Sequence, residues 1–134
     1  YGLGGPAGPV GADRFEKAVE FANHLKRFRL GAGFPPITPQ SYLEDSEDRG
    51  LVKSILFDME ANGETESVRK YELVIRWLEE LAQRGGERYD EYGVPTRDPA
   101  VGFTAPELAA RIAIGWQEVL LGRNEAQIPS PASP

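Results

Sequence analysis

The chain has no cysteine and only one histidine among its 134 residues. The lack of cysteine excludes disulfides, thiol nucleophiles and thiolate metal sites. No run of apolar residues approaches the roughly 20 that an α-helix needs to cross a bilayer. A segment with the strand-like alternation of apolar and polar residues is also missing. These absences favour a helical domain outside the membrane. A reducing cytoplasm is the simplest location, although missing cysteines do not fix the compartment.

A basic excess is missing as well. The chain carries 15 Lys and Arg against 21 Asp and Glu, which gives a net charge of −6 and a pI of about 4.9. Proteins that bind nucleic acids usually present a basic face, and anionic membrane surfaces attract basic segments. We therefore expect neither a nucleic acid nor a membrane as the partner of this chain.

Apolar residues at helical spacing predict four main helices. Asp13 with Glu16 makes a capping box before the first helix, and Gly50 separates a short turn after Ser41 from the second. Asn62 and Gly63 end the second helix, because both residues are typical of helix C-termini. The predicted helices cover about 14–29, 51–61, 66–84 and 105–121.

The last predicted helix, 105–121, is apolar on almost every side. Thr104 and Glu107 form a capping box at its start, and Phe103 with Leu108 has the spacing of a hydrophobic staple. A helix that is apolar all round is normally buried. Burial on two sides needs two neighbours, so we expect that one of them belongs to another chain.

The segments outside the helices are rich in glycine and proline. We expect an extended N-terminal arm over 1–12, a helical domain over 13–122 and an extended C-terminal arm over 123–134. Residues 87–103 form a long connection, with a short helical turn at 87–91. Loops of this length in a compact domain are usually functional, and this one is long enough to wrap around a partner. The predicted fold class is therefore all-α, a small four-helix domain with Gly/Pro-rich extended termini and a long ordered loop.

No catalytic, metal-binding or cofactor-binding residue is predicted. His24 has no nucleophile motif beside it, and the Glu-x-x-His pairs of a di-iron bundle are absent. The glycines at 2–5 and 31–33 follow no predicted strand, so they do not form a phosphate-binding loop. The basic residues of 24–29 suit the last turn of a helix. An acidic protein or a nucleic acid as their ligand is the less favoured interpretation.

The leading functional hypothesis is a non-catalytic accessory or structural subunit that docks on a larger homo- or hetero-oligomeric protein assembly. Apolar residues widen the third and fourth helices beyond their core stripes, and two tyrosines stand in a polar loop. Aromatic residues are enriched at the energetic centres of protein interfaces. Core packing is nevertheless the default for Trp77 and Trp116, and local packing is as good an interpretation of Tyr89 and Tyr92 as contact with a partner. The predicted partner-binding residues are Leu73, Trp77, Tyr89, Tyr92, Ile114 and Leu121.

An enzyme is the first alternative. Mg²⁺ needs only one or two protein carboxylates together with substrate phosphates, so acidic helix residues would suffice for a phosphohydrolase of small molecules. The candidate ligands are Glu79, Glu80, Glu87 and Asp90.

The second alternative is an acidic inhibitor that occupies a basic cleft. Four acids stand in a run of five residues, although acids also suit the first turn of a helix. The candidates are Glu44, Asp45, Glu47 and Asp48.

Overall fold

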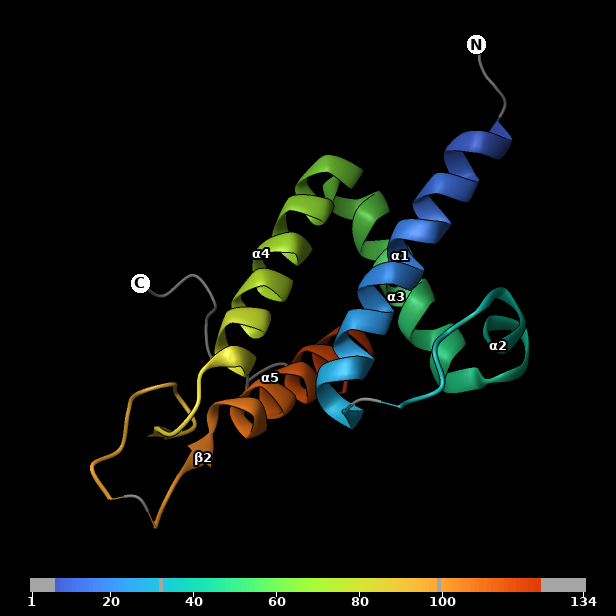
Figure 1. Ribbon diagram of the computed structural model, residues 1–134. Coiled ribbons are helices and arrows are strands. Elements are labelled where there is room, and N and C mark those ends of the chain that lie inside the picture. The colour runs from blue at the N-terminus through green and yellow to red at the C-terminus, as the bar shows by residue number, and fades with distance from the viewer. Residues whose placement is uncertain (1–6, 32, 99, 124–134) are drawn as a thin grey trace.

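The computed structural model describes residues 7–31, 33–98 and 100–123 (Figure 1). The described residues are mostly helical, which confirms the all-α expectation in its coarse form, and a small two-stranded sheet is added. In chain order the elements are α1 (Ala7–Leu30), α2 (Pro39–Glu44), α3 (Ser46–Asn62), α4 (Glu64–Gln83), β1 (Arg88–Tyr89), β2 (Phe103–Thr104) and α5 (Ala105–Leu120).

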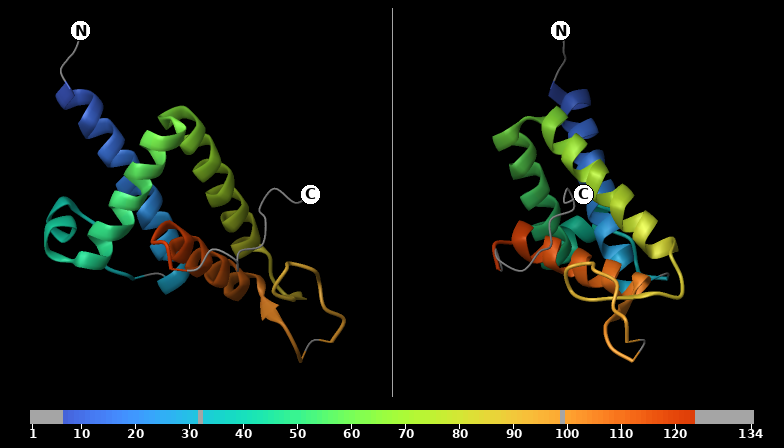
Figure 2. Two further views of the ribbon diagram at one scale, coloured as in Figure 1. Left: turned by 180° about the vertical axis from the view of Figure 1, so that it is seen from behind. Right: turned by 90° about the vertical axis from the view of Figure 1, so that its left-hand side faces the viewer.

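The core lies where four helices meet. α3 and α4 form a helical hairpin, and α5 crosses the lower ends of α1 and α4 (Figures 1 and 2). α5 packs against α1, α3 and α4. One fully buried side chain from each helix marks the centre of this core: Leu25, Ile55, Leu78 and Ile112. None of the described helices combines the length and the apolar character that a bilayer span requires.

The apolar face of α5 is covered mainly within the chain. Leu108, Ala109 and Ile112 are at most 2% exposed, because α1, α3 and α4 surround them. Ile114, at 42% exposed, is the large apolar residue of α5 that remains open. The core face of this helix therefore supplies no argument for a second chain.

α1 begins earlier than expected. It starts at Ala7, so residues 7–12 continue the helix and are not an extended arm, and Asp13 is not its N-cap. Pro9 falls in the first turn, where backbone N–H groups have no partner inside the helix and proline costs little. The remainder of the predicted N-terminal arm, and 124–134 of the predicted C-terminal arm, lie outside the described residues.

The break between α2 and α3 falls at Asp45, and the expected break at Gly50 is wrong. The Asp45 side chain accepts hydrogen bonds from the backbone N–H groups of Glu47 and Asp48, at 2.9 and 3.1 Å, and so caps α3. Gly50 lies inside α3. α4 begins at Glu64 directly after Gly63, whose φ of 83° ends α3 as expected.

A small sheet closes the long connection between α4 and α5. β1 and β2 are antiparallel, with Tyr89 opposite Phe103, so the expected helical turn at 87–91 is wrong. Gly102 has a φ of +88°, and a Cβ there would stand 2.6 Å from the carbonyl oxygen of Tyr89. Only glycine fits this close approach. The predicted capping box of Thr104 and Glu107 is confirmed at the start of α5.

Candidate functional site

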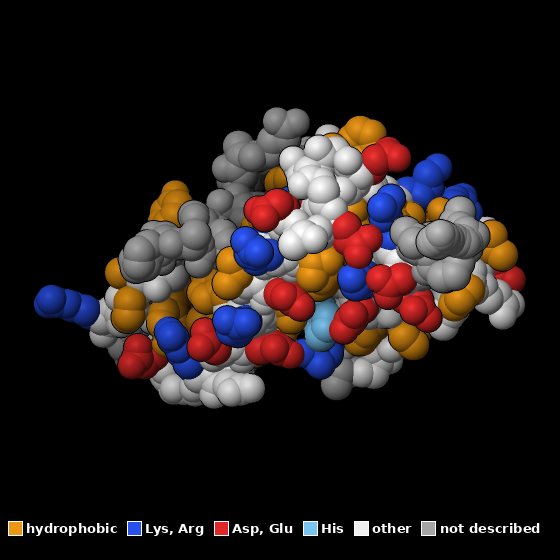
Figure 3. Space-filling model, turned by 90° about the horizontal axis from the view of Figure 1, so that it is seen from above, with side chains coloured by type: hydrophobic (Ala, Val, Ile, Leu, Met, Phe, Trp, Pro, Cys, Tyr) orange, Lys and Arg blue, Asp and Glu red, His pale blue; other side chains and the backbone are white. Residues whose placement is uncertain are grey.

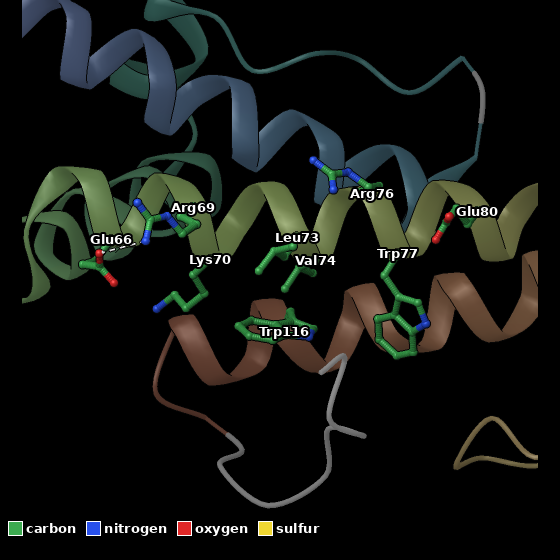
Figure 4. Close-up of a pocket in the computed structure, with 9 residues that line it drawn as sticks. All are labelled: Glu66, Arg69, Lys70, Leu73, Val74, Arg76, Trp77, Glu80 and Trp116. Atoms are coloured by element: carbon green, nitrogen blue, oxygen red, sulfur yellow. Dashed lines mark ion pairs between the residues drawn. The ribbon is translucent and has the colours of Figure 1, made fainter. Parts of the chain in front are cut away.

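A groove of about 480 Å³ lies between α4 and α5 (Figure 4). Most of its residues come from one face of α4, where positions three and four apart lie side by side. α5 contributes a single aromatic side chain. The lining residues are Glu66, Arg69, Lys70, Leu73, Val74, Arg76, Trp77, Glu80 and Trp116.

Both tryptophans of the chain line this groove. Trp77 reaches from α4 towards α5, and the ring of Trp116 lies between the two helices (Figure 4). Both are partly buried and pack against the core. Leu73 is 54% exposed although its neighbour Val74 is buried. The groove therefore has a buried aliphatic floor, two indole walls and an exposed leucine.

The indole N–H of Trp116 is buried without a hydrogen-bond acceptor among the described residues. The large majority of buried side-chain polar atoms in native proteins have a hydrogen-bond partner. An acceptor for this N–H therefore has to come from solvent, from another part of the chain or from a bound molecule.

The rim of the groove is charged but largely paired. Glu66 contacts Arg69 at 3.5 Å, and Lys70 contacts Asp58 of α3 at 2.9 Å. Arg76 and Glu80, which also line the groove, add one charge of each sign, so the rim carries no excess of either sign. The groove therefore favours an occupant that buries apolar surface over one recognised by its charge.

Asp58 fixes the position of Lys70. Its carboxylate accepts hydrogen bonds from Lys70, from the Ser67 hydroxyl at 3.0 Å and from the Tyr71 hydroxyl at 3.1 Å. Burial alone would raise the pKa of Asp58, but the hydrogen bonds from Lys70 and Ser67 outweigh it and leave this pKa below its ordinary value. Burial, followed by the nearby Asp58 charge, raises the pKa of Tyr71. The cluster thus holds α3 and α4 together at one end of the groove.

The structure brings two of the six predicted partner-binding residues together. Leu73 and Trp77 line the groove, and Trp116 joins them although it was assigned to the core. Helical periodicity on α5 could not reveal this role of Trp116, because the groove depends on how α5 lies against α4. The available signal in the sequence was that the chain has just two tryptophans, one in each of the helices that form the groove.

Tyr89 is not on the surface of the described chain. It is 4% exposed and belongs to the core, because the pairing of β1 with β2 turns it towards α5. Its place in a polar loop was misleading, since residues paired across 14 positions of sequence are not visible in local composition. This burial argues against the predicted contact of Tyr89 with a partner.

The remaining three predicted residues do not form one surface with the groove. Tyr92 is 72% exposed in the turn after β1, where the Asp90 side chain accepts its backbone N–H at 2.8 Å. Ile114 is exposed on α5 but does not line the groove. Leu121 is partly buried against the core and lies beside Gly50 of α3.

The carboxylates proposed as magnesium ligands do not lie together in one site. Glu79 pairs with Arg27 at 3.2 Å, and Asp90 accepts hydrogen bonds within its own turn. Within 7–31, 33–98 and 100–123 there is no group of three His, Asp or Glu side chains placed to hold a metal ion. No observation in the described part of the chain therefore favours the phosphohydrolase alternative.

The acidic run is engaged within the fold. Asp45 caps α3, and Glu47 contacts Arg123 at 3.4 Å. Asp48 is buried against Lys26 at 3.1 Å, and Lys26 also donates to the carbonyl oxygen of Pro35. Acidic and basic side chains are intermixed on the face shown in Figure 3, and no single-sign surface stands out there. These contacts leave the acidic-inhibitor alternative without a free acidic cluster.

The basic residues of 24–29 have separate roles. Lys26 is inside the fold with Asp48, and Arg27 pairs with Glu79 on α4. Arg27 and Arg29 occupy the last turn of α1, as expected for helix-end stabilisation. The buried Lys26–Asp48 pair was not predicted, because two charges far apart in sequence give no local sign that they meet.

Comparison of the chain with protein-family models, with curated proteins and with solved structures finds no significant match.

Proposed function

We propose that this protein is a non-catalytic docking subunit that binds a partner protein through the groove between α4 and α5. The observation that carries the proposal is the placement of Trp77, Trp116 and the exposed Leu73 in one groove. Tryptophan is among the residues most enriched at energetically dominant interface positions. The proposal retains the cytoplasmic location expected from the sequence.

The size of the groove limits how a partner is bound. Stable interfaces between globular surfaces usually bury about 1,200–2,000 Å² in total. The groove accommodates a few side chains, so we infer that the partner inserts a short segment and does not apply a flat surface. The polar rim around the indoles resembles the arrangement in which polar residues surround a desolvated interface centre.

The proposal can be tested with the tagged full-length chain and native mass spectrometry of the purified complex. Leu73→Glu places a charge on the groove, whereas Leu43→Glu places the same charge on α2, where Leu43 is 73% exposed. We expect the wild type and Leu43→Glu to retain the same stoichiometric partner and Leu73→Glu to lose it. A monomeric wild type, or a partner retained by Leu73→Glu, would contradict the proposal.

A further inference from the structure

We propose that the groove between α4 and α5 accepts a proline-rich segment, and that residues 128–134 of the same chain are its occupant. This segment reads Ile128-Pro129-Ser130-Pro131-Ala132-Ser133-Pro134 and lies outside the described residues. This inference rests on the proposed function: residues 128–134 would occupy the groove until a partner segment of the same proline-rich chemistry displaces them.

The walls of the groove suit proline. Proline-rich segments favour the polyproline II conformation and are recognised by grooves lined with aromatic side chains. Trp77 and Trp116 supply two such walls (Figure 4). A polyproline II segment makes no internal hydrogen bonds, so its carbonyl groups remain free to accept. The indole N–H of Trp116 has no acceptor within the described residues, and a carbonyl of the segment would reach it if the ring turned this buried nitrogen towards the groove.

The dimensions of groove and segment agree. From Glu66 to Glu80 the groove follows α4 for about 21 Å at 1.5 Å per residue. Residues 128–134 would extend for about 22 Å at 3.1 Å per residue in polyproline II. The segment is therefore long enough to contact both tryptophans at once.

The connection to α5 is also long enough. Trp116 stands about 6 Å along the helix axis from Leu120, the end of α5, and a compact turn leads from there to Arg123, the last described residue. Residues 124–127 reach at most about 14 Å when extended. α5 runs in the direction opposite to that of α4 and crosses it (Figures 1 and 4), so a chain that leaves the end of α5 and reverses direction can enter the groove between them.

Charge favours this occupant over a charged helix. Residues 128–134 carry no charged side chain. The groove offers Val74 and the indoles as its apolar surface, and the rim charges of Arg69 and Lys70 are paired with Glu66 and Asp58. Because the segment has no charged side chain, its binding would depend mainly on apolar contact, and we expect it to be only weakly sensitive to salt.

The absence of cysteine and the presence of only two tryptophans allow a direct test in the full-length chain. Ala132→Cys provides a single attachment site for a nitroxide spin label. The two indole N–H signals in a ¹⁵N NMR spectrum are assigned with Trp77→Phe and Trp116→Phe. We expect the label to broaden both indole signals beyond detection, and reduction of the nitroxide to restore them.

A matched variant separates docking from simple tethering. The labelled chain with Pro129→Gly and Pro131→Gly has the same length and attachment but lacks the preference for polyproline II. We expect the indole signals to reappear in this variant while the rest of the spectrum is unchanged. Equal broadening in the glycine variant, or none in the parent, would overturn the inference.

A mixed sample shows whether residues 128–134 occupy the groove of their own chain or the groove of a second copy. Spin-labelled chain at natural isotope abundance is combined with unlabelled ¹⁵N chain. Broadening of the ¹⁵N indole signals in this mixture would mean that the segment docks on a second copy, and would overturn the same-chain assignment. A partner lost from Leu73→Glu without any docking of 128–134 would leave the proposed function standing and remove this inference alone.

Discussion

α3 and α5 both pack against α4, but the two contacts use different chemistry. α3 is joined to α4 by the Asp58 carboxylate, which receives donors from Ser67, Lys70 and Tyr71. Asp48 joins the same helix to Lys26 of α1. Between α4 and α5, by contrast, no side-chain hydrogen bond or ion pair is formed in the described part of the chain. That contact relies on apolar packing and leaves the groove open.

This difference in chemistry assigns the α3–α4 contact to folding and the α4–α5 contact to binding. Hydrogen-bonded carboxylates restrict how α3 is oriented, because a buried charge tolerates few geometries. Apolar packing between α4 and α5 is less directional and leaves indole and leucine surface available at the edge of the core. Changes in the carboxylate contacts should therefore affect folding, whereas changes in the groove should affect binding.

We expect the largest change in the free energy of unfolding for Asp48→Ala. Lys26 is 7% exposed, so the substitution leaves a buried ammonium without its carboxylate. We expect the free energy of unfolding to fall by about 3–5 kcal/mol, measured by urea denaturation. The double variant Lys26→Met/Asp48→Leu removes both charges and should recover most of this loss. A loss below about 1 kcal/mol for Asp48→Ala would contradict a role for this pair in the core.

We expect a smaller loss of unfolding free energy for Asp58→Asn. The amide keeps the shape of the side chain but removes the charge that accepts from Lys70 and Tyr71, which should cost about 1–3 kcal/mol in urea denaturation.

The same variant tests how the contribution of Asp58 to the unfolding free energy depends on pH. The folded-state pKa of Asp58 lies below the ordinary 3.8, so the folded state binds this proton less readily than the unfolded state. The stabilisation is complete above the ordinary pKa and is lost as the pH falls through the folded-state pKa. The difference in unfolding free energy between wild type and Asp58→Asn should therefore shrink on acidification from neutral pH to below 3.8. A constant difference would exclude this linkage.

The smallest effect is expected for Leu73→Ala, which probes the groove. Leu73 is 54% exposed, so we expect its removal to change the unfolding free energy by less than about 0.5 kcal/mol. Leu78→Ala on the same helix is the matched control. Leu78 is fully buried, and its truncation should cost about 2–5 kcal/mol. Equal losses for the two leucines would show that the groove belongs to the core and that Leu73 contributes to folding as Leu78 does.

The predicted helices were recoverable where the signal is local. The capping box at Thr104 and Glu107 and the stop at Gly63 are confirmed, since both involve residues within one turn. The break at Asp45 was missed, because an aspartate that caps the next helix looks the same as one on an exposed face. Tyr89 was misplaced because its burial depends on strand pairing across the whole connection.

The sequence by itself determined the helical class, the C-terminal ends of the main helices and the apolar excess of 66–84 and 105–121. Only the tertiary structure decided that most of this excess is covered inside the chain, that Lys26 meets Asp48, and that Trp77 and Trp116 share one groove. The reason is physical. Caps and helical periodicity arise between residues a few positions apart. A groove or a buried ion pair depends on the angle and register at which two separate helices pack, and no local pattern encodes that geometry.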